Sequence, residues 1–136
     1  MVIEVMIVTE DSDASNFLKK KLNNLDAEYK IIEVDDGMKC LCFLEDNHIP
    51  DVILIDVEMD GMDGIDVFNK LKGNSILKNI PLVFLLGRND GFSEFFICNV
   101  LGADCILKPV DVADLKIKIE KVLEIPEINN LETYIG

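Results

Sequence analysis

The sequence has few basic residues and no long hydrophobic run. Its 13 lysines and arginines stand against 26 aspartates and glutamates, which gives a formal net charge of −13. Such a charge repels nucleic acid and anionic membranes, so we expect no direct binding of this segment to either. No apolar run approaches the roughly 20 residues that span a bilayer, and the amino-terminal stretch contains Glu4 but no basic region. The sequence therefore predicts no transmembrane segment, no signal peptide and a cytoplasmic location.

Cysteine is also scarce. The four cysteines are Cys40, Cys42, Cys98 and Cys105, and only the first two are close together in the sequence. A structural zinc site or a disulfide framework normally needs more closely spaced pairs. We therefore predict buried, free thiols in a reducing compartment.

Five short apolar runs predict the strands of a sheet. They cover residues 2–8, 29–34, 52–55, 82–86 and 105–107. An unbroken apolar run, rather than an alternating one, indicates a strand that is covered on both faces, as in a parallel sheet.

Apolar residues at helical spacing predict a helix after each strand. These helices lie at about residues 14–25, 38–44, 67–71, 92–100 and 112–123. Ser12 or Asp13 is the expected cap of the first helix, Gly102 ends the fourth, and Asp111 caps the fifth. The alternation indicates an α/β fold with a doubly wound, five-stranded parallel sheet. We predict one domain over residues 1–124 and, over residues 125–136, a tail that is either a linker or a frayed end.

Charged side chains follow three of the predicted strands, at the point where each strand ends. Glu10 and Asp11 follow the first strand, Asp56 follows the third, and Lys108 follows the fifth. The carboxyl ends of parallel strands meet at one edge of the sheet, where ligands of such folds bind. Clustered carboxylates repel one another without a cation, and Mg²⁺ prefers oxygen ligands. An aspartate at this edge can attack a phosphoryl group, while the metal and the lysine neutralise its oxygens.

The same residues carry a resemblance to the receiver domains of response regulators in two-component signalling systems. The stretch PDVILIDVEMDGMDGIDVFNKL resembles the family's phosphorylation segment, with Asp56 at the phosphoacceptor position. GADCILKPVD places Lys108 at the family's lysine, and TEDSD resembles its acidic, metal-binding turn. The similarity covers about residues 2–124 and implies a flavodoxin-like (βα)5 receiver architecture.

The resemblance also implies a function and a set of roles. A sensor histidine kinase or a phosphotransfer protein would phosphorylate Asp56, and Lys108 would pair with the phosphoryl group. Glu10 and Asp11 would hold Mg²⁺ together with the backbone carbonyl of Glu58. Helical periodicity also allows Thr9 and Glu10 as the metal-binding pair, but two acids suit a divalent cation better. The protein would catalyse only its own phosphorylation and dephosphorylation, and would not be an enzyme with a separate substrate.

Three departures from the family pattern affect the expected response. Leu86 stands where the family usually has Thr or Ser, and Asp60 replaces the usual Pro in the loop after the phosphoacceptor. Between Gly102 and Lys108 one residue is missing, and Cys105 stands where an aromatic switch residue often lies. Leu86 favours a second interpretation, a degenerate receiver that acts as a phosphorylation-independent interaction module. The retained residues of the acidic site argue against it, namely Glu10, Asp11, Asp56 and Lys108. A phosphatase of the haloacid dehalogenase type would need D-x-D after the first strand. A flavodoxin would need a phosphate loop rich in Ser, Thr and Gly.

Two further expectations concern the surface. Residues 95–98 are four consecutive apolar residues, so at about 3.6 residues per turn they cannot all face the sheet. The fourth helix should therefore present a surface for a homodimer or an effector, as receivers often do, unless loops or the tail with Tyr134 cover it. Glu58 and Arg88 should flank the mouth of the site, either as an ion pair or as two solvated charges.

Overall fold

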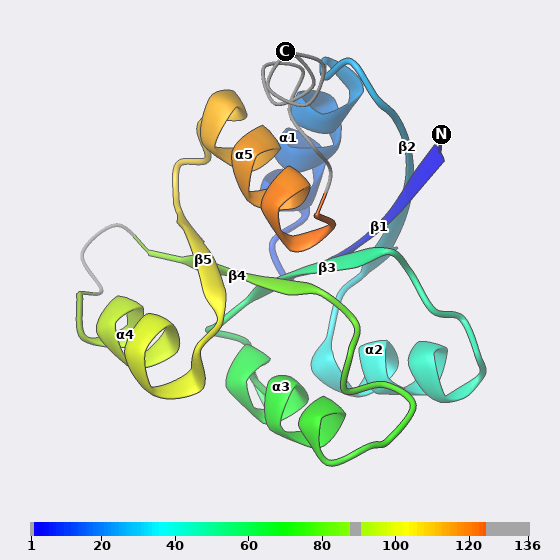
Figure 1. Cartoon of the computed structure of the whole chain (residues 1–136), viewed down its shortest axis with the longest axis vertical. Coiled ribbons are helices and arrows are strands. Elements are labelled where there is room, and N and C mark those ends of the chain that lie inside the picture. Colours follow the sequence, from blue (N-terminus) through cyan, green and yellow to red (C-terminus); the bar gives the residue numbers. More distant parts are fainter. Residues whose placement is uncertain (1, 88–90, 125–136) are drawn as a thin grey trace, which may run out of the picture.

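A five-stranded parallel sheet forms the middle layer of the protein, with helices on both of its faces (Figure 1). The computed structural model describes residues 2–87 and 91–124, so the expectations for Arg88 and for the tail with Tyr134 lie outside the described residues. The strands are β1 (Val2–Val8), β2 (Glu28–Val34), β3 (Val52–Asp56), β4 (Leu82–Leu86) and β5 (Asp104–Leu107). The helices are α1 (Ser12–Asn23), α2 (Gly37–Glu45), α3 (Gly64–Lys72), α4 (Gly91–Phe95), the π-helix η1 (Phe96–Leu101) and α5 (Val112–Val122).

The strand order is β2-β1-β3-β4-β5, and all neighbouring strands are parallel. This order confirms the predicted doubly wound sheet of the flavodoxin-like type. The chain leaves β1 toward β2 on one side and later reaches β3 on the other side. The topological switch point therefore lies between the carboxyl ends of β1 and β3, where ligands of such sheets bind.

The strand predictions agree with the structure to within one residue at each end. β1 and β4 have the predicted bounds, β2 and β5 each begin one residue earlier, and β3 extends by one residue to Asp56. Every residue of β3 and β4 is buried, whereas Val34 is the only buried residue of the edge strand β2. The central strands are thus covered on both faces, as their unbroken apolar runs indicate.

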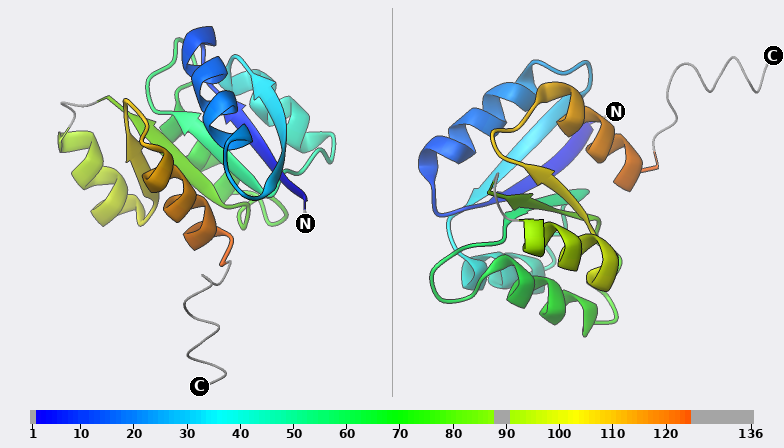
Figure 2. Two further views of the ribbon diagram at one scale, coloured as in Figure 1. Left: turned by 90° about the horizontal axis from the view of Figure 1, so that it is seen from above. Right: turned by 90° about the vertical axis from the view of Figure 1, so that its left-hand side faces the viewer.

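Helices α1 and α5 cover one face of the sheet, and α2, α3 and the α4–η1 segment cover the other (Figures 1 and 2). On the first face, Leu18 and Leu22 of α1 and Ile119 of α5 are buried. On the second face, Phe68 of α3 packs against Phe84 of β4 with ring centroids 5.5 Å apart. Each buried aliphatic or aromatic side chain contributes about 1.5–3 kcal/mol to folding. No helix within residues 2–87 and 91–124 is long and apolar enough to cross a membrane.

The first helix has a different cap from the predicted one. Its N-cap is Asp11, whose carboxylate accepts hydrogen bonds from the backbone N–H groups of Asp13 (2.9 Å) and Ala14 (3.2 Å). The prediction of Ser12 or Asp13 is therefore wrong, because the extended backbone at Asp11 already places a carboxylate over the first free N–H groups. The predicted cap of α5 is confirmed, since Asp111 accepts from the second and third residues of that helix.

The fourth helix differs from the prediction in its geometry. The sequence predicts one helix over residues 92–100, but the short α4 is followed by η1, which Gly102 ends in a left-handed conformation (φ 66°). A π-helix makes i→i+5 hydrogen bonds, so its side chains are distributed differently around the axis. Ile97 is buried, whereas Phe92 and Phe95 are 81% and 62% exposed. The expectation that part of this apolar run faces outward is confirmed.

All four cysteines are free, but only two of them are buried. Cys40 and Cys105 are buried, and Cys42 and Cys98 are exposed. The prediction of buried thiols is therefore wrong for Cys42 and Cys98. Residues two positions apart on a helix do not share a face, so the burial of Cys40 turns Cys42 toward the surface.

Candidate functional site

Asp56 lies at the switch point between β1 and β3. The strand that carries it runs through the core, with Ile53, Leu54 and Ile55 fully buried, and Asp56 itself is only 4% exposed. Burying a carboxylate is costly unless the group is paired and hydrogen-bonded. The partners of Asp56 therefore decide what this site can do.

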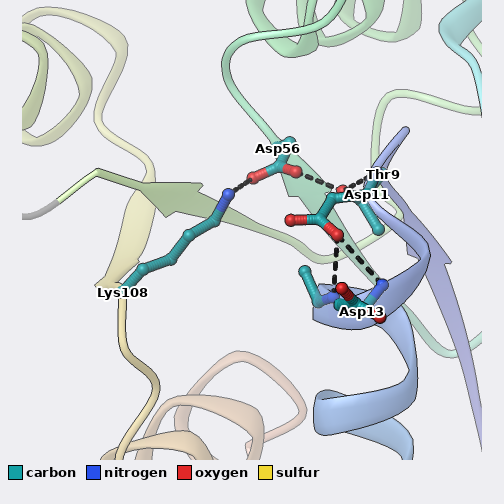
Figure 3. A network of polar contacts seen from close by, with 6 residues as sticks. Thr9, Asp11, Asp13, Asp56 and Lys108 are labelled. Carbon is teal, nitrogen blue, oxygen red and sulfur yellow. Dashed lines mark hydrogen bonds and ion pairs between the residues drawn. The ribbon is translucent and has the colours of Figure 1, made fainter.

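Two side chains that directly follow other strands of the sheet contact the Asp56 carboxylate (Figure 3). Lys108, directly after β5, forms an ion pair with Oδ1 through its Nζ atom. Thr9, directly after β1, donates a hydrogen bond from Oγ1 to Oδ2. Each carboxylate oxygen thus has a partner, and the Lys108 ammonium compensates the negative charge.

The backbone holds Lys108 beside the ends of β4 and β5. Its N–H donates to the carbonyl of Leu86 over 2.8 Å, one step beyond the last residue of β5. The Lys108–Pro109 peptide bond that follows is cis. From this position the side chain reaches past β4 to Asp56 on β3 (Figure 3). The structure therefore brings Asp56 and Lys108 together, as the sequence predicts.

Thr9 contacts Asp56, although the sequence favours Glu10 and Asp11 as the residues of this turn that form the site. Thr9 is 3% exposed, and its Oγ1 also accepts a hydrogen bond from the backbone N–H of Asp11 (3.1 Å). One hydroxyl group thus links Asp56 to the turn before α1. The sequence feature that points to Thr9 is helical periodicity, which allows Thr9 and Glu10 as the alternative metal-binding pair.

Glu10 and Asp11 make their described contacts away from the Asp56 carboxylate. Glu10 accepts a hydrogen bond through Oε1 from the backbone N–H of Asp60, in the loop after β3. The Asp11 carboxylate caps α1. In the part of the chain that the structure describes, no group of three or more His, Cys, Asp or Glu residues is arranged to hold a metal ion. The expected convergence of three carboxylates is therefore not found in this arrangement.

The donor chemistry of the site still fits Mg²⁺. This ion is usually held by one or two carboxylates, and substrate phosphates and several waters complete its shell. Asp56 and Glu10 provide carboxylates at the ends of two adjacent strands, and the Thr9 hydroxyl adds a neutral oxygen beside Asp56. Glu58 is exposed two residues after Asp56, and the use of its backbone carbonyl as a ligand stays a prediction.

Gly64 allows α3 to begin against the backbone of Asp56. A Cβ atom at position 64 would lie 2.3 Å from the carbonyl oxygen of Asp56, far inside van der Waals contact. The N–H of Gly64 donates to the carbonyl of Val57 (3.0 Å). Asp63 and Asp66 close the start of the helix with a capping box. Asp63 and Gly64 thus hold the loop after β3 close to Asp56.

The two predicted switch positions are part of the apolar core. Leu86, the last residue of β4, is 1% exposed, and Cys105 of β5 is 9% exposed. Both belong to one cluster with Ile97 of η1. Burial, with a contribution from the hydrogen bond to Cys98, raises the pKa of the Cys105 thiol to about 12. Leu86 offers no hydrogen-bond donor, so the end of β4 presents no hydroxyl group to this site.

Comparisons of the sequence with known proteins point to one family. Residues 5–120 match the response regulator receiver domain. The two-component response regulator-like PRR37 of Oryza sativa subsp. indica is 31% identical over 117 residues, which are 84% of this chain and 15% of that protein. This chain is thus similar to a small part of that relative.

Solved structures have the same fold. A putative response regulator from Chloroflexus aurantiacus J-10-fl has a TM-score of 0.82 at 22% identity, and the match covers 91% of this chain and 99% of that chain. The Mn²⁺-bound form of response regulator Rcp1 has a TM-score of 0.68 at 24% identity, over 90% of this chain and 91% of that chain. Because the family match extends over most of the sequence, the chain belongs to the response regulator receiver domains of two-component signalling.

Proposed function

We propose that this receiver is a phosphoacceptor switch of a two-component phosphorelay, and that Asp56 takes the phosphoryl group. The observation that carries the proposal is the buried Asp56 carboxylate, with Lys108 at one oxygen and Thr9 at the other. A carboxylate oxygen attacks the phosphorus atom, the bond between phosphorus and the leaving group breaks, and an acyl phosphate forms. The Lys108 ammonium is already beside the reacting oxygens and stabilises the charge on the phosphoryl group.

The proposed donor is a sensor histidine kinase or a phosphotransfer protein. Membership of the receiver family supports a histidine kinase as partner. We propose that the protein catalyses only its own phosphorylation and dephosphorylation, without turning over a separate substrate. Since the phosphoryl group comes originally from ATP, we assign this reaction to the cytoplasm.

We further propose Mg²⁺ as the cation of the site, with the carboxylates of Glu10 and Asp56 and the backbone carbonyl of Glu58 as ligands. Bound Mg²⁺ neutralises charge on the transferring phosphoryl group. The support is the donor chemistry of these residues and the Mn²⁺-bound form of a structurally similar receiver. Asp11 is the other predicted ligand, and its role as the cap of α1 favours Glu10 over it.

The test is the intact mass of the protein after treatment with acetyl phosphate and Mg²⁺. We expect one added phosphoryl group, and we expect Asp56→Asn or a chelator to prevent it. Asp51→Asn is the matched control, because Asp51 is an exposed aspartate just before the same strand. Persistent labelling of the Asp56→Asn variant would show that the acceptor is a different residue.

A degenerate receiver is the second candidate function. The observation that favours it is Leu86, which is buried in the core where the family usually has a hydroxyl residue. Such a module would bind its partner equally well with and without Asp56 phosphorylation. A partner affinity that stays constant on phosphorylation, in a protein that does accept the group, would favour this candidate over the switch.

The fourth helix is the proposed contact surface for a second copy of the chain or for an effector. Phe92, Phe95 and Val100 are 81%, 62% and 61% exposed, which leaves a patch of apolar side chains over α4 and η1. Such a patch often marks an interaction site. Sedimentation across a range of concentrations should show association that Phe95→Glu abolishes. Ile76→Glu, at an apolar side chain that is 70% exposed outside these helices, is the control and should leave association intact.

A further inference from the structure

Two cysteines from neighbouring elements are in contact at the edge of the sheet. Cys98 belongs to η1 and Cys105 to β5, and their Sγ atoms are 3.7 Å apart. Cys98 is exposed to solvent, whereas Cys105 is only 9% exposed. The pair therefore combines a thiol that a small oxidant can reach with a second thiol directly behind it.

The other two cysteines do not form such a pair. Cys40 and Cys42 are two residues apart on α2, so they lie on different sides of the helix. Cys40 is fully buried, and its Sγ contacts the sulfur of Met6 at 3.8 Å. Burial also raises the pKa of the Cys40 thiol to about 12, which keeps it protonated. Cys42 thus serves as an internal control, being an exposed thiol without a thiol partner among the described contacts.

We propose that Cys98 and Cys105 form a reversible disulfide when hydrogen peroxide oxidises the protein. The Cys98 sulfur attacks one peroxide oxygen, the O–O bond breaks, and a sulfenic acid and one water are formed. The Cys105 sulfur then attacks the Cys98 sulfur, the S–O bond breaks, and the leaving hydroxide takes the Cys105 proton as a second water. With hydrogen peroxide, two thiols lose two electrons in total and the peroxide is reduced to two waters.

The exposure of the two thiols fixes the order of these steps. The exposed Cys98 meets the oxidant first, and Cys105 resolves the sulfenic acid from within the protein. Cys105 is only 9% exposed and lies behind Cys98, so a small oxidant reaches Cys98 first. The two sulfur atoms must approach from 3.7 Å to the bonded distance of about 2 Å. Rotation of the Cys98 side chain on the surface-exposed η1 supplies this movement.

The disulfide would connect the fourth helix covalently to the edge strand of the sheet. In the sequence, both cysteines are close to Phe92, Phe95 and Val100, the exposed apolar side chains of the fourth helix. Cys105 also occupies one of the two predicted switch positions. Oxidation would therefore act on the fourth helix and β5, the part of the receiver that is expected to respond to phosphorylation. It requires no phosphoryl group on Asp56, so the inference does not depend on the proposed function.

The experiment uses the full chain, treated with hydrogen peroxide and then digested without reductant on the amino side of aspartate. Cleavage before Asp104 separates the two cysteines into peptides 90–103 and 104–110. We expect these peptides to remain joined after oxidation and to separate with dithiothreitol. Cys98→Ser should abolish the joined product, because peptide 90–103 contains no other cysteine.

Two controls complete the test. Cys42→Ser should leave the joined product unchanged, and Asp56→Asn should form it to the same extent, which separates this inference from the phosphorylation chemistry. The circular dichroism of Cys98→Ser verifies that this surface substitution leaves the fold intact. The proposal is overturned if oxidised protein gives separate peptides 90–103 and 104–110, or if Cys98 is found mainly in disulfides between two copies of the chain.

Discussion

The carboxyl edge of the sheet has two regions with opposite chemistry. At the ends of β1 and β3, polar side chains contact one another directly, with Thr9 donating to Asp56 and Lys108 reaching across to form an ion pair. At the end of β4, the corresponding position is the buried, apolar Leu86, and the buried Cys105 lies two residues before the end of β5. In the proposed switch, one set of residues would hold the phosphoacceptor Asp56 and a different set would respond to its phosphorylation. The residues that hold the acceptor can be retained in a sequence in which the responding residues have changed.

The two regions also differ in what attaches them to the rest of the fold. The acceptor is fixed by close backbone contacts, since the first residue of α3 lies against the carbonyl of Asp56. The fourth helix is attached through the apolar side chain of Ile97, which shares a cluster with Leu86 and Cys105. In the proposed function, a phosphoryl group on Asp56 would meet the closely packed start of α3 on one side and the apolar end of β4 on the other.

The largest expected effect comes from breaking the rigid region at Gly64. In Gly64→Ala, the new Cβ would meet the carbonyl oxygen of Asp56 at 2.3 Å, so the start of α3 must move away from β3. We expect the free energy of unfolding in urea to fall by about 2–4 kcal/mol. Acceptance of a phosphoryl group should fall with it, because the loop after Asp56 shifts.

Gly73→Ala is the matched control for this substitution. Gly73 ends α3 with an ordinary backbone conformation, and an added Cβ would find only normal contacts at 3.7 and 3.8 Å. Its stability should change by less than about 0.5 kcal/mol. Equal losses in the two variants would show that α3 is generally intolerant of alanine, and that the close approach to Asp56 has no special importance.

A smaller effect distinguishes the two acids of the turn after β1. Glu10→Gln removes one carboxylate of the proposed Mg²⁺ site but keeps an oxygen that can accept from the Asp60 N–H. We expect Mg²⁺ affinity, measured by calorimetric titration, to fall about tenfold, or roughly 1.4 kcal/mol. Asp11→Asn should change it by less than about twofold, because asparagine caps a helix about as well as aspartate.

The opposite order of the two effects on Mg²⁺ affinity would show that Asp11 is a ligand of the metal site. If Asp11→Asn weakens Mg²⁺ binding more than Glu10→Gln does, the Asp11 carboxylate must leave the N-cap of α1 when the ion binds. Loss of helix stability on addition of Mg²⁺ would accompany that rearrangement.

Most of the fold could be predicted from the sequence, because its signals are local. The apolar runs of β1, β3 and β4, interrupted only by Glu4, predict buried strands, and Asp111 and Gly102 predict helix ends by their own backbone chemistry. The convergence of Asp56 and Lys108 also follows, since both residues stand at strand ends of a parallel sheet.

The remaining features depend on competition between local interactions. Asp11 can serve either a metal or the free N–H groups of α1, and in the structure it caps the helix. Thr9 is uncharged and is therefore not conspicuous in the sequence as a site residue, although its hydroxyl group contacts Asp56. Residue spacing alone does not predict the π-helical geometry of η1 or the contact between Cys98 and Cys105 of β5.

We expect Leu86 to weaken the connection between the proposed acceptor Asp56 and the fourth helix. A hydroxyl at this position would add one hydrogen bond to the phosphoryl group, a bias of about 0.5–1.5 kcal/mol between two states. A modification shifts two states only by the difference in its interactions with them. Leu86→Thr supplies the missing donor and should therefore enlarge the response of residues 91–107.

The direct measurement is the set of backbone amide chemical shifts before and after phosphorylation with acetyl phosphate. In the parent protein we predict changes near Asp56 and in the loop after β3, with small changes in α4, η1 and β5. In Leu86→Thr the changes in these three elements should grow, while the phosphorylated fraction stays the same. Large shifts throughout residues 91–107 of the phosphorylated parent protein would contradict the account.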